Sequence, residues 1–224
     1  MDRFNIALDG PAGAGKSSAA RLVAGRLGFV YVDTGAMYRA VTWKILQLGL
    51  KPEQTEEVVK AARRMNIKLT PGPEGQQVYV DGMDVTDLIR SGDINRNVSQ
   101  VAQIAEIREL LVDKQKELAA NKGIVMDGRD IGTKVLPDAE VKVYLTASTR
   151  ERAERRYSEL VNPTLTLDEL EKEIAARDRM DSERCISPLA QAEDAVLLDT
   201  TGMSLHEVVE AVLELCRSKV GGGR

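Results

Sequence analysis

Short apolar runs alternate with stretches in which apolar residues recur every three or four positions along most of this chain of 224 residues. The runs are typical of strands buried in a sheet, and the three-to-four spacing predicts amphipathic helices. Predicted strands are residues 4–8, 29–32, 124–126, 141–145 and 195–199. Predicted helices are residues 18–27, 36–48, 53–65, 97–121 and 204–219, with one more opened by Ser148 and another running from Thr166 to about Glu183. This order predicts an α/β fold, a five-stranded parallel sheet flanked by helices.

Residues 66 to 85 depart from this order, because two short segments of period-two alternation flank a turn rich in proline and glycine. That pattern predicts a small antiparallel sheet of two or three strands. We therefore assign residues 1–60 and 96–220 to the core, residues 60–95 to an insertion, and residues 221–224 to a disordered tail. Within the core, the helical spacing places Leu22, Leu48 and Leu118 on buried faces.

Between the first strand and the first helix lies a match to G-x-x-x-x-G-K-[ST], a loop whose backbone N–H groups surround nucleotide phosphates. Its glycines permit close approach of backbone to phosphate, and the following helix adds its positive dipole end. Lys16 can reach the outer phosphates, and the Ser17 hydroxyl can occupy one position on Mg²⁺. The loop therefore predicts that ATP or a similar nucleotide binds here with Mg²⁺.

Charged residues follow the predicted strands, at the edge where a parallel sheet binds ligands. Asp127 comes directly after a buried strand and is the expected second Mg²⁺ contact, through water. Tyr38 and Arg39 lie in the first turns of the helix that begins near residue 36. On local grounds Arg39 is either a surface arginine or a ligand for an anion above the sheet, and both interpretations stay open.

Two basic helices near the C-terminal end predict a lid, residues 148–166, that closes over phosphates. Arg152, Arg155 and Arg156 share a helix face by their spacing, although neighbouring glutamates leave a solvated ion-pair face as the alternative. On the next helix Arg177, Asp181 and Arg184 also align. Such a face can bind an anion and a ribose hydroxyl, or form an ordinary network of ion pairs.

Composition narrows the function classes. A net charge of −4 and an aromatic content of 4% argue against nucleic acid as a partner. The two cysteines lack metal or disulfide spacing, and no apolar run is long enough to cross a bilayer, which predicts a cytoplasmic protein without membrane contact. The single histidine, His206, lies in a capping box that opens the last helix, so histidine acid–base chemistry is not expected.

Three classes of phosphate-loop protein compete at this point. A GTPase would need an Asn-Lys-x-Asp-like guanine reader, which the sequence lacks. A motor or transporter ATPase would usually be longer. A small-molecule kinase needs a second anion pocket and a mobile cover, and the arginines after the strand ends fit this class best.

The chain also resembles the bacterial cytidylate kinases nearly from end to end, including the insertion. The resemblance rests on five segments in the expected order: Gly10-Pro11-Ala12-Gly13-Ala14-Gly15-Lys16-Ser17, Asp33-Thr34-Gly35-Ala36-Met37-Tyr38-Arg39, Asn97-Val98-Ser99-Gln100-Val101-Ala102, Asp127-Gly128-Arg129-Asp130-Ile131-Gly132-Thr133 and Arg177-Asp178-Arg179-Met180-Asp181-Ser182-Glu183-Arg184. It implies phosphoryl transfer from ATP to CMP or dCMP with Mg²⁺, and it favours the functional interpretation of Arg39.

The resemblance also implies site residues. The ATP loop corresponds to Gly10, Pro11, Ala12, Gly13, Ala14, Gly15, Lys16, Ser17 and Ser18. The acceptor side corresponds to Thr34, Tyr38, Arg39, Ser99, Arg108, Arg129, Asp130, Arg177, Asp181 and Arg184. Residues expected to act on the transferred phosphoryl group are Lys16, Arg129, Asp130, Arg155, Arg156 and Arg184. Thr34 stands where many relatives carry serine, which keeps the hydroxyl and adds a methyl group.

We expect a monomer that acts on small-molecule nucleotides. The alternative is a kinase of the same architecture for another acceptor, such as UMP or a small hydroxylated acid. An ATP-binding regulator without activity is a third hypothesis. An acceptor screen separates them, because only the regulator releases no ADP with any acceptor.

Overall fold

A computed structural model describes residues 3–72, 75–159 and 165–221. Its main sheet contains five parallel strands in the order β2-β6-β1-β7-β8. The strands are β1 (Asn5–Asp9), β2 (Val30–Asp33), β6 (Ile124–Gly128), β7 (Val141–Thr146) and β8 (Val196–Asp199). All five predicted strands are confirmed, and so is the parallel arrangement. The connection from β1 runs toward β2 on one side of the sheet, whereas the connections from β6 and β7 run toward the other side, so the strand order reverses at β1. This reversal is a topological switch point.

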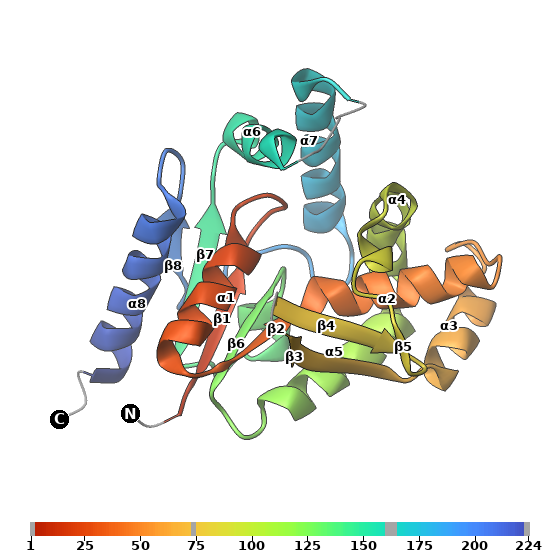
Figure 1. The fold of residues 1–224 in the computed structure, drawn as a ribbon, viewed down its shortest axis with the longest axis horizontal. Helices are drawn as coiled ribbons and strands as arrows, with labels where there is room; N and C mark the ends of the chain where they lie inside the picture. The colour runs from red at the N-terminus through yellow and green to blue at the C-terminus, as the bar shows by residue number, and fades with distance from the viewer. Residues whose placement is uncertain (1–2, 73–74, 160–164, 222–224) are drawn as a thin grey trace.

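Helices cover both faces of the sheet and stand above its carboxyl edge (Figure 1). They are α1 (Lys16–Leu27), α2 (Thr34–Gln47), α3 (Thr55–Arg64), α4 (Gly92–Val101), α5 (Ala105–Ala119), α6 (Thr149–Ser158), α7 (Leu167–Glu183) and α8 (Leu205–Gly221). Alternation along β1 explains the layers. Ile6 and Leu8 pack with α1 and α8, whereas Ala7 packs with residues of α5 on the other face. The α6 and α7 helices lie over the strand ends (Figure 1).

The predicted antiparallel sheet is confirmed as β3 (Ile67–Gly72), β4 (Gly75–Val80) and β5 (Met83–Asp84). Residues 73–74 at its turn lie outside the described part of the chain. The sheet has no separate core, because Val78 and Val80 belong to one hydrophobic cluster with Met37 of α2, Val58 of α3 and Ile107 of α5. Helix α2 therefore joins this small sheet to the strand ends of the main one.

The prediction of one long helix over residues 97–121 is wrong. The chain forms α4 and α5 instead, separated at residues 102–104, where Ile104 has an extended ψ of 117°. The break frees the Ala102 carbonyl, which accepts a hydrogen bond of 3.1 Å from Nη1 of the buried Arg108. The apolar spacing continues across the break because Val101, Ile104 and Ile107 pack in the same cluster, so periodicity does not detect it.

Three leucines predicted to be buried are exposed: Leu22, Leu48 and Leu118. On α1, small side chains such as Ala19 and Ala20 make the contact with the sheet, and Leu22 points away from it. Leu48 lies just beyond the last turn of α2, and Leu118 is near the end of α5.

Two other expectations lie partly or wholly outside the described residues. The lid at 148–166 includes residues 160–164, and the disordered tail includes residues 222–224. Gly221 itself is the last residue of α8.

Candidate active site

Carboxylates lie side by side at the carboxyl edge of the main sheet. Asp33 on β2 is paired in register with Asp127 on β6, and Asp9 ends the neighbouring β1. The Asp9 carboxylate accepts hydrogen bonds from the backbone N–H groups of Ile131, at 2.8 Å, and Gly132, at 2.7 Å. Burial raises the pKa of Asp9 to about 6, although these two bonds oppose the shift. Asp9 thus fixes the turn that follows Arg129 and Asp130.

The segment from Gly10 to Ser18, hereafter the phosphate loop, connects β1 to α1. Gly10 and Gly13 have positive φ angles of 145° and 76°, which side chains disfavour. A Cβ atom on Gly10 would lie 1.9 Å from the Leu145 carbonyl oxygen, so no other residue fits there. The loop therefore presents backbone N–H groups and the start of α1 toward the edge of the sheet.

Lys16 is buried beneath this loop, and its ammonium donates a hydrogen bond of 2.6 Å to the Pro11 carbonyl oxygen. Burial lowers the pKa of Lys16, and the nearby positive charge of Arg129 lowers it further. The negative charges of Asp127 and Asp9 oppose both effects. Negatively charged phosphate oxygens near the Lys16 ammonium would favour its protonated form and raise this lowered pKa again.

Ser17 and Asp127, the two predicted Mg²⁺ residues, are in direct contact. The Ser17 hydroxyl donates to Oδ2 of Asp127 at 2.8 Å, and the Tyr31 hydroxyl donates to Oδ1 at 3.0 Å. Burial raises the pKa of Asp127, and the nearby Asp33 adds to the rise. The described residues contain no group of three or more His, Cys, Asp or Glu side chains able to hold a metal ion. Any Mg²⁺ here would take its other ligands from nucleotide or water.

Five arginines, hereafter the arginine cluster, gather beside the phosphate loop from four segments of the chain. They are Arg39 on α2, Arg108 on α5, Arg129 after β6, and Arg177 and Arg184 on or just after α7. Three carboxylates pair with four of them. Arg39 contacts Asp33 at 2.8 Å, Arg129 contacts Asp181 at 2.9 Å, and both Arg108 and Arg184 face Asp130. Positive charge therefore exceeds negative charge within this group.

Several buried guanidinium donors of the arginine cluster have no hydrogen-bond partner among the residues that the structure describes. They are Nε of Arg39, Arg108 and Arg177, and Nη2 of Arg184. Burial lowers the pKa of Arg177 to about 10, and the positive charge of Arg129 contributes next. Because buried donors without hydrogen bonds are costly, this cluster is suited to an anion with several acceptor oxygens. The positive charge of Arg129 also lowers the pKa of Lys16, so the cluster and the phosphate loop adjoin.

The other residues expected on the acceptor side have different surroundings. Arg108 stacks over the Tyr38 ring, 5.4 Å from its centroid, and burial raises the pKa of Tyr38 to about 12. Ser99 is buried on α4. The Thr34 hydroxyl donates to the Asp127 carbonyl oxygen at 2.7 Å, which ties the start of α2 to β6.

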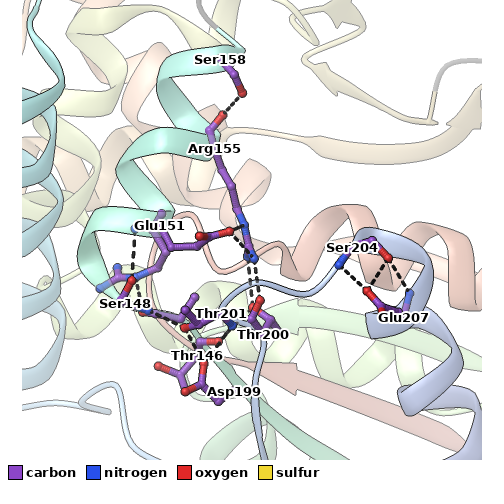
Figure 2. Close-up of polar contacts among 12 residues, drawn as sticks. Thr146, Ser148, Glu151, Arg155, Ser158, Asp199, Thr200, Thr201, Ser204 and Glu207 are labelled. Atoms are coloured by element: carbon purple, nitrogen blue, oxygen red, sulfur yellow. Dashed lines mark hydrogen bonds and ion pairs between the residues drawn. The ribbon is translucent and has the colours of Figure 1, made fainter.

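The three arginines that the spacing places on one face of α6 contact different parts of the structure. Figure 2 shows Arg155 extended toward the loop after β8, where it donates to the Thr200 carbonyl oxygen at 2.6 Å. Within α6 it also donates to the Glu151 carboxylate at 3.0 Å. Arg156 pairs with Glu159 on the exposed side of the helix. Ser148, predicted to open this helix, caps it by accepting a hydrogen bond from the Glu151 N–H, while the Glu151 side chain turns to Arg155 (Figure 2).

Tyr31, Gln76 and Asp178 at this edge were given no role from sequence, and Arg152 was placed only on the basic face of the lid helix. Tyr31 could have been found, because it lies two positions before Asp33 on a strand and so shares its face. Gln76 reaches from the antiparallel sheet to accept a hydrogen bond of 3.1 Å from the Asp33 N–H. Arg152 and Asp178 contact each other and the phosphate loop. Local pattern gives no signal for those contacts.

Comparisons with known proteins agree with this geometry. A family model described as cytidylate kinase matches residues 6–218. A cytidylate kinase of Desulfitobacterium hafniense is 50% identical over 98% of this chain and 95% of its own length. One from Exiguobacterium sibiricum is 52% identical over 96% and 97%. The crystal structure of a gluconokinase from Sinorhizobium meliloti superposes with a TM-score of 0.51 at 16% identity, covering 98% of this chain and 97% of that one, which shows a shared fold.

Proposed function

We propose that this chain, which belongs to the cytidylate kinase family, transfers the γ-phosphoryl group of ATP to CMP or dCMP and releases ADP with CDP or dCDP. The observation that carries this proposal is the arginine cluster, with its unpaired buried donors beside a phosphate loop. One anionic nucleotide fits the backbone amides of the loop, and a second fits the guanidinium groups. Such a pair of sites brings donor and acceptor phosphates together.

On the donor side, the phosphate loop from Gly10 to Ser18 holds the ATP phosphates, and Lys16 turns from the Pro11 carbonyl toward them. The oxygens of Ser17 and Asp127, 2.8 Å apart, are the hard ligands that Mg²⁺ prefers, so this pair fits the ion. Asp127 contacts it directly or through water. When bound, Mg²⁺ supplies positive charge that offsets the phosphate charges.

On the acceptor side, Arg39, Arg129 and Arg184 hold the monophosphate, and Arg177 with Asp181 binds the ribose. Asp130 accepts a hydrogen bond from the cytosine amino group, while Ser99 and Arg108 donate to the ring acceptors. Thr34 and Tyr38 complete the wall of the base pocket. Uracil presents a carbonyl in place of the amino group, and facing that carbonyl with a buried carboxylate costs on the order of several kcal/mol. Selectivity for CMP over UMP follows.

Transfer needs alignment and charge neutralisation more than proton chemistry. Lys16 and Arg129 act where donor and acceptor phosphates meet, because they are close enough that the positive charge of Arg129 lowers the pKa of Lys16. Arg155 and Arg156 on α6 add positive charge above the loop. Arg155 already lies beside the loop while it is bonded to Thr200 and Glu151, since a Cβ atom on Gly15 would be 3.8 Å from its Nη1 atom. Arg156 reaches the phosphates only after leaving Glu159.

The ligands in this proposal are small nucleotides, and the protein acts as a cytoplasmic monomer without nucleic acid or membrane. Among the helices of the described residues, none has the length and apolar character to cross a bilayer. The net charge of −4 gives no overall basic surface for nucleic acid.

A coupled assay of ADP release with CMP, dCMP, UMP, AMP and shikimate tests the proposal. We expect CMP and dCMP to exceed UMP by about tenfold or more in kcat/KM. Fastest release with UMP or shikimate would instead support a kinase of another acceptor. An absence of ADP release with every acceptor would support an ATP-binding regulator.

A further inference from the structure

A three-way contact joins the phosphate loop to both helices above it. The Ala12 N–H donates to Oδ1 of Asp178 on α7 at 3.4 Å, and the Ala12 carbonyl accepts from Nη1 of Arg152 on α6 at 2.9 Å. Arg152 Nη1 also contacts Oδ2 of Asp178 at 2.6 Å. Side chains from two helices thus hold the N–H and the carbonyl of one loop residue.

This contact is built into the interior and is not a solvated ion pair. The side chain of Arg152 is 5% exposed and that of Asp178 is 19% exposed. Arg152 also donates through Nε to the Ala147 carbonyl at 2.9 Å, which fixes its guanidinium plane. A Cβ atom on Gly13 would lie 3.1 Å from the Arg152 Cβ, so α6 packs directly on the loop. Movement of the loop and of these helices cannot be independent.

Asp178 occupies a particular position on α7. The residue before it, Arg177, belongs to the arginine cluster, and Asp181, one helical turn later, pairs with Arg129. One rigid helix therefore carries two residues of the acceptor pocket and one ligand of the donor loop. The Ala12–Asp178 bond is long for a hydrogen bond and hence weak, whereas the Arg152–Asp178 pair is short. A nucleotide that orders this turn of α7 from the acceptor side can strengthen its contact with the phosphate loop, and the converse holds as well.

We propose that Asp178 is a positioning residue that couples the two nucleotide sites, so that CMP bound against α7 tightens the binding of ATP by the phosphate loop. This inference rests on the proposed function for the identity of the two ligands. Asp178 touches neither ligand: it acts through Ala12 and Arg152. By thermodynamic reciprocity, ATP must tighten CMP binding by the same factor. The first nucleotide bears the ordering cost, and the second binds to a site already ordered.

The test is calorimetric titration of a non-hydrolysable ATP analogue with and without saturating CMP. We expect CMP to tighten the analogue on the order of tenfold in the unmodified chain. In Asp178→Asn this factor should fall toward one, while the affinity for CMP alone changes less than about twofold. In turnover, the KM for ATP at saturating CMP should rise more than kcat falls. Asp178→Glu, which keeps the charge, should restore part of the factor.

Asp168→Asn is the matched control. Asp168 lies on the same helix and also contacts an α6 arginine at 2.6 Å, but that arginine, Arg150, is exposed and pairs with Glu154 and Glu171 as well as with Asp168. This variant should keep the full factor. Retention of the full factor in Asp178→Asn would overturn the inference. If Asp178→Asn proves too unstable, Arg152→Lys, which loses the guanidinium fork, must reduce the factor as well, and its failure to do so also overturns the inference.

The outcomes distinguish a failure of the coupling from a failure of the proposed function. CMP binding and turnover without any coupling in the unmodified chain would overturn this inference and leave the proposed function intact. An absence of CMP binding would overturn both.

Discussion

The phosphate loop and the arginine cluster are adjacent, yet they present positive charge by different means. The loop uses backbone N–H groups from one continuous segment, and its shape follows from glycines such as Gly10 and Gly13. The arginine cluster uses side chains from four segments, held by Asp33, Asp130 and Asp181. A backbone site tolerates many side-chain changes but no added Cβ at its glycines. A side-chain site fails when one guanidinium is lost, and its parts can be tested one at a time.

Lys16 is the one residue through which we expect the phosphate loop to act by side-chain charge. Lys16→Met therefore tests most directly whether backbone N–H groups alone can serve the transferred phosphate. Methionine fills the buried space without leaving a charge, and the transferred phosphoryl group loses its nearest cation. We expect kcat to fall about 10³-fold while CMP affinity stays within about threefold. Lys142→Met is the control, because Lys142 is equally buried but pairs with Asp194 away from the loop. A loss of less than about tenfold would mean that backbone amides suffice.

Arg129→Ala asks whether the two sites are distinct. Arg129 supplies charge-assisted hydrogen bonds to the acceptor phosphate, and their loss should weaken CMP binding about 10- to 100-fold. ATP binding should change far less, because removing Arg129 also relieves its repulsion of Lys16. Titration of each nucleotide separately, with exposed Arg150→Ala as control, gives the answer. Equal weakening of both nucleotides would mean that Arg129 does not belong to the acceptor site.

Asp130→Asn sharpens the description of the acceptor pocket. The asparagine keeps the shape beside Arg108 and Arg184 but places a donor where the cytosine amino group should bind. We expect the ratio of kcat/KM for CMP to that for UMP to fall about tenfold. Asp181→Asn, at another buried carboxylate of this pocket, should weaken both substrates alike. If the ratio does not change in Asp130→Asn, the base is recognised by other residues.

The smallest expected effect is a proton taken up by the phosphate loop. Burial lowers the pKa of Lys16 in the absence of phosphate, and bound phosphate raises it again. Near pH 8, above the second phosphate pKa of about 6, ATP binding should therefore consume up to about one proton and weaken as pH rises. Calorimetry in two buffers with different ionisation enthalpies measures this uptake. Lys16→Met should abolish it, and buffer-independent enthalpies in the unmodified chain would contradict the expectation.

The sequence predicted the fold and the phosphate loop well because both depend on short-range patterns. Apolar runs and glycine spacing place β1, the loop and α1 in continuous order, and the same logic finds the antiparallel sheet. The sequence-based prediction failed at residues 102–104, where the apolar spacing is helical but the backbone is not. The apolar stripe continues through Ile104, but the backbone breaks there so that Ala102 can meet Arg108, a contact that spacing alone does not encode.

What the sequence determined by itself is thus the backbone-built half of the site, together with the residues that the family resemblance assigns to the other half. Only the tertiary structure decided which charges meet. It paired Arg129 with Asp181, left Nε of Arg177 without a hydrogen-bond partner among the described residues, bound Arg155 to Thr200, and placed Arg152 and Asp178 on Ala12. The physical reason is that hydrogen bonds within a loop depend on neighbours in the chain, whereas ion pairs between helices depend on how those helices pack.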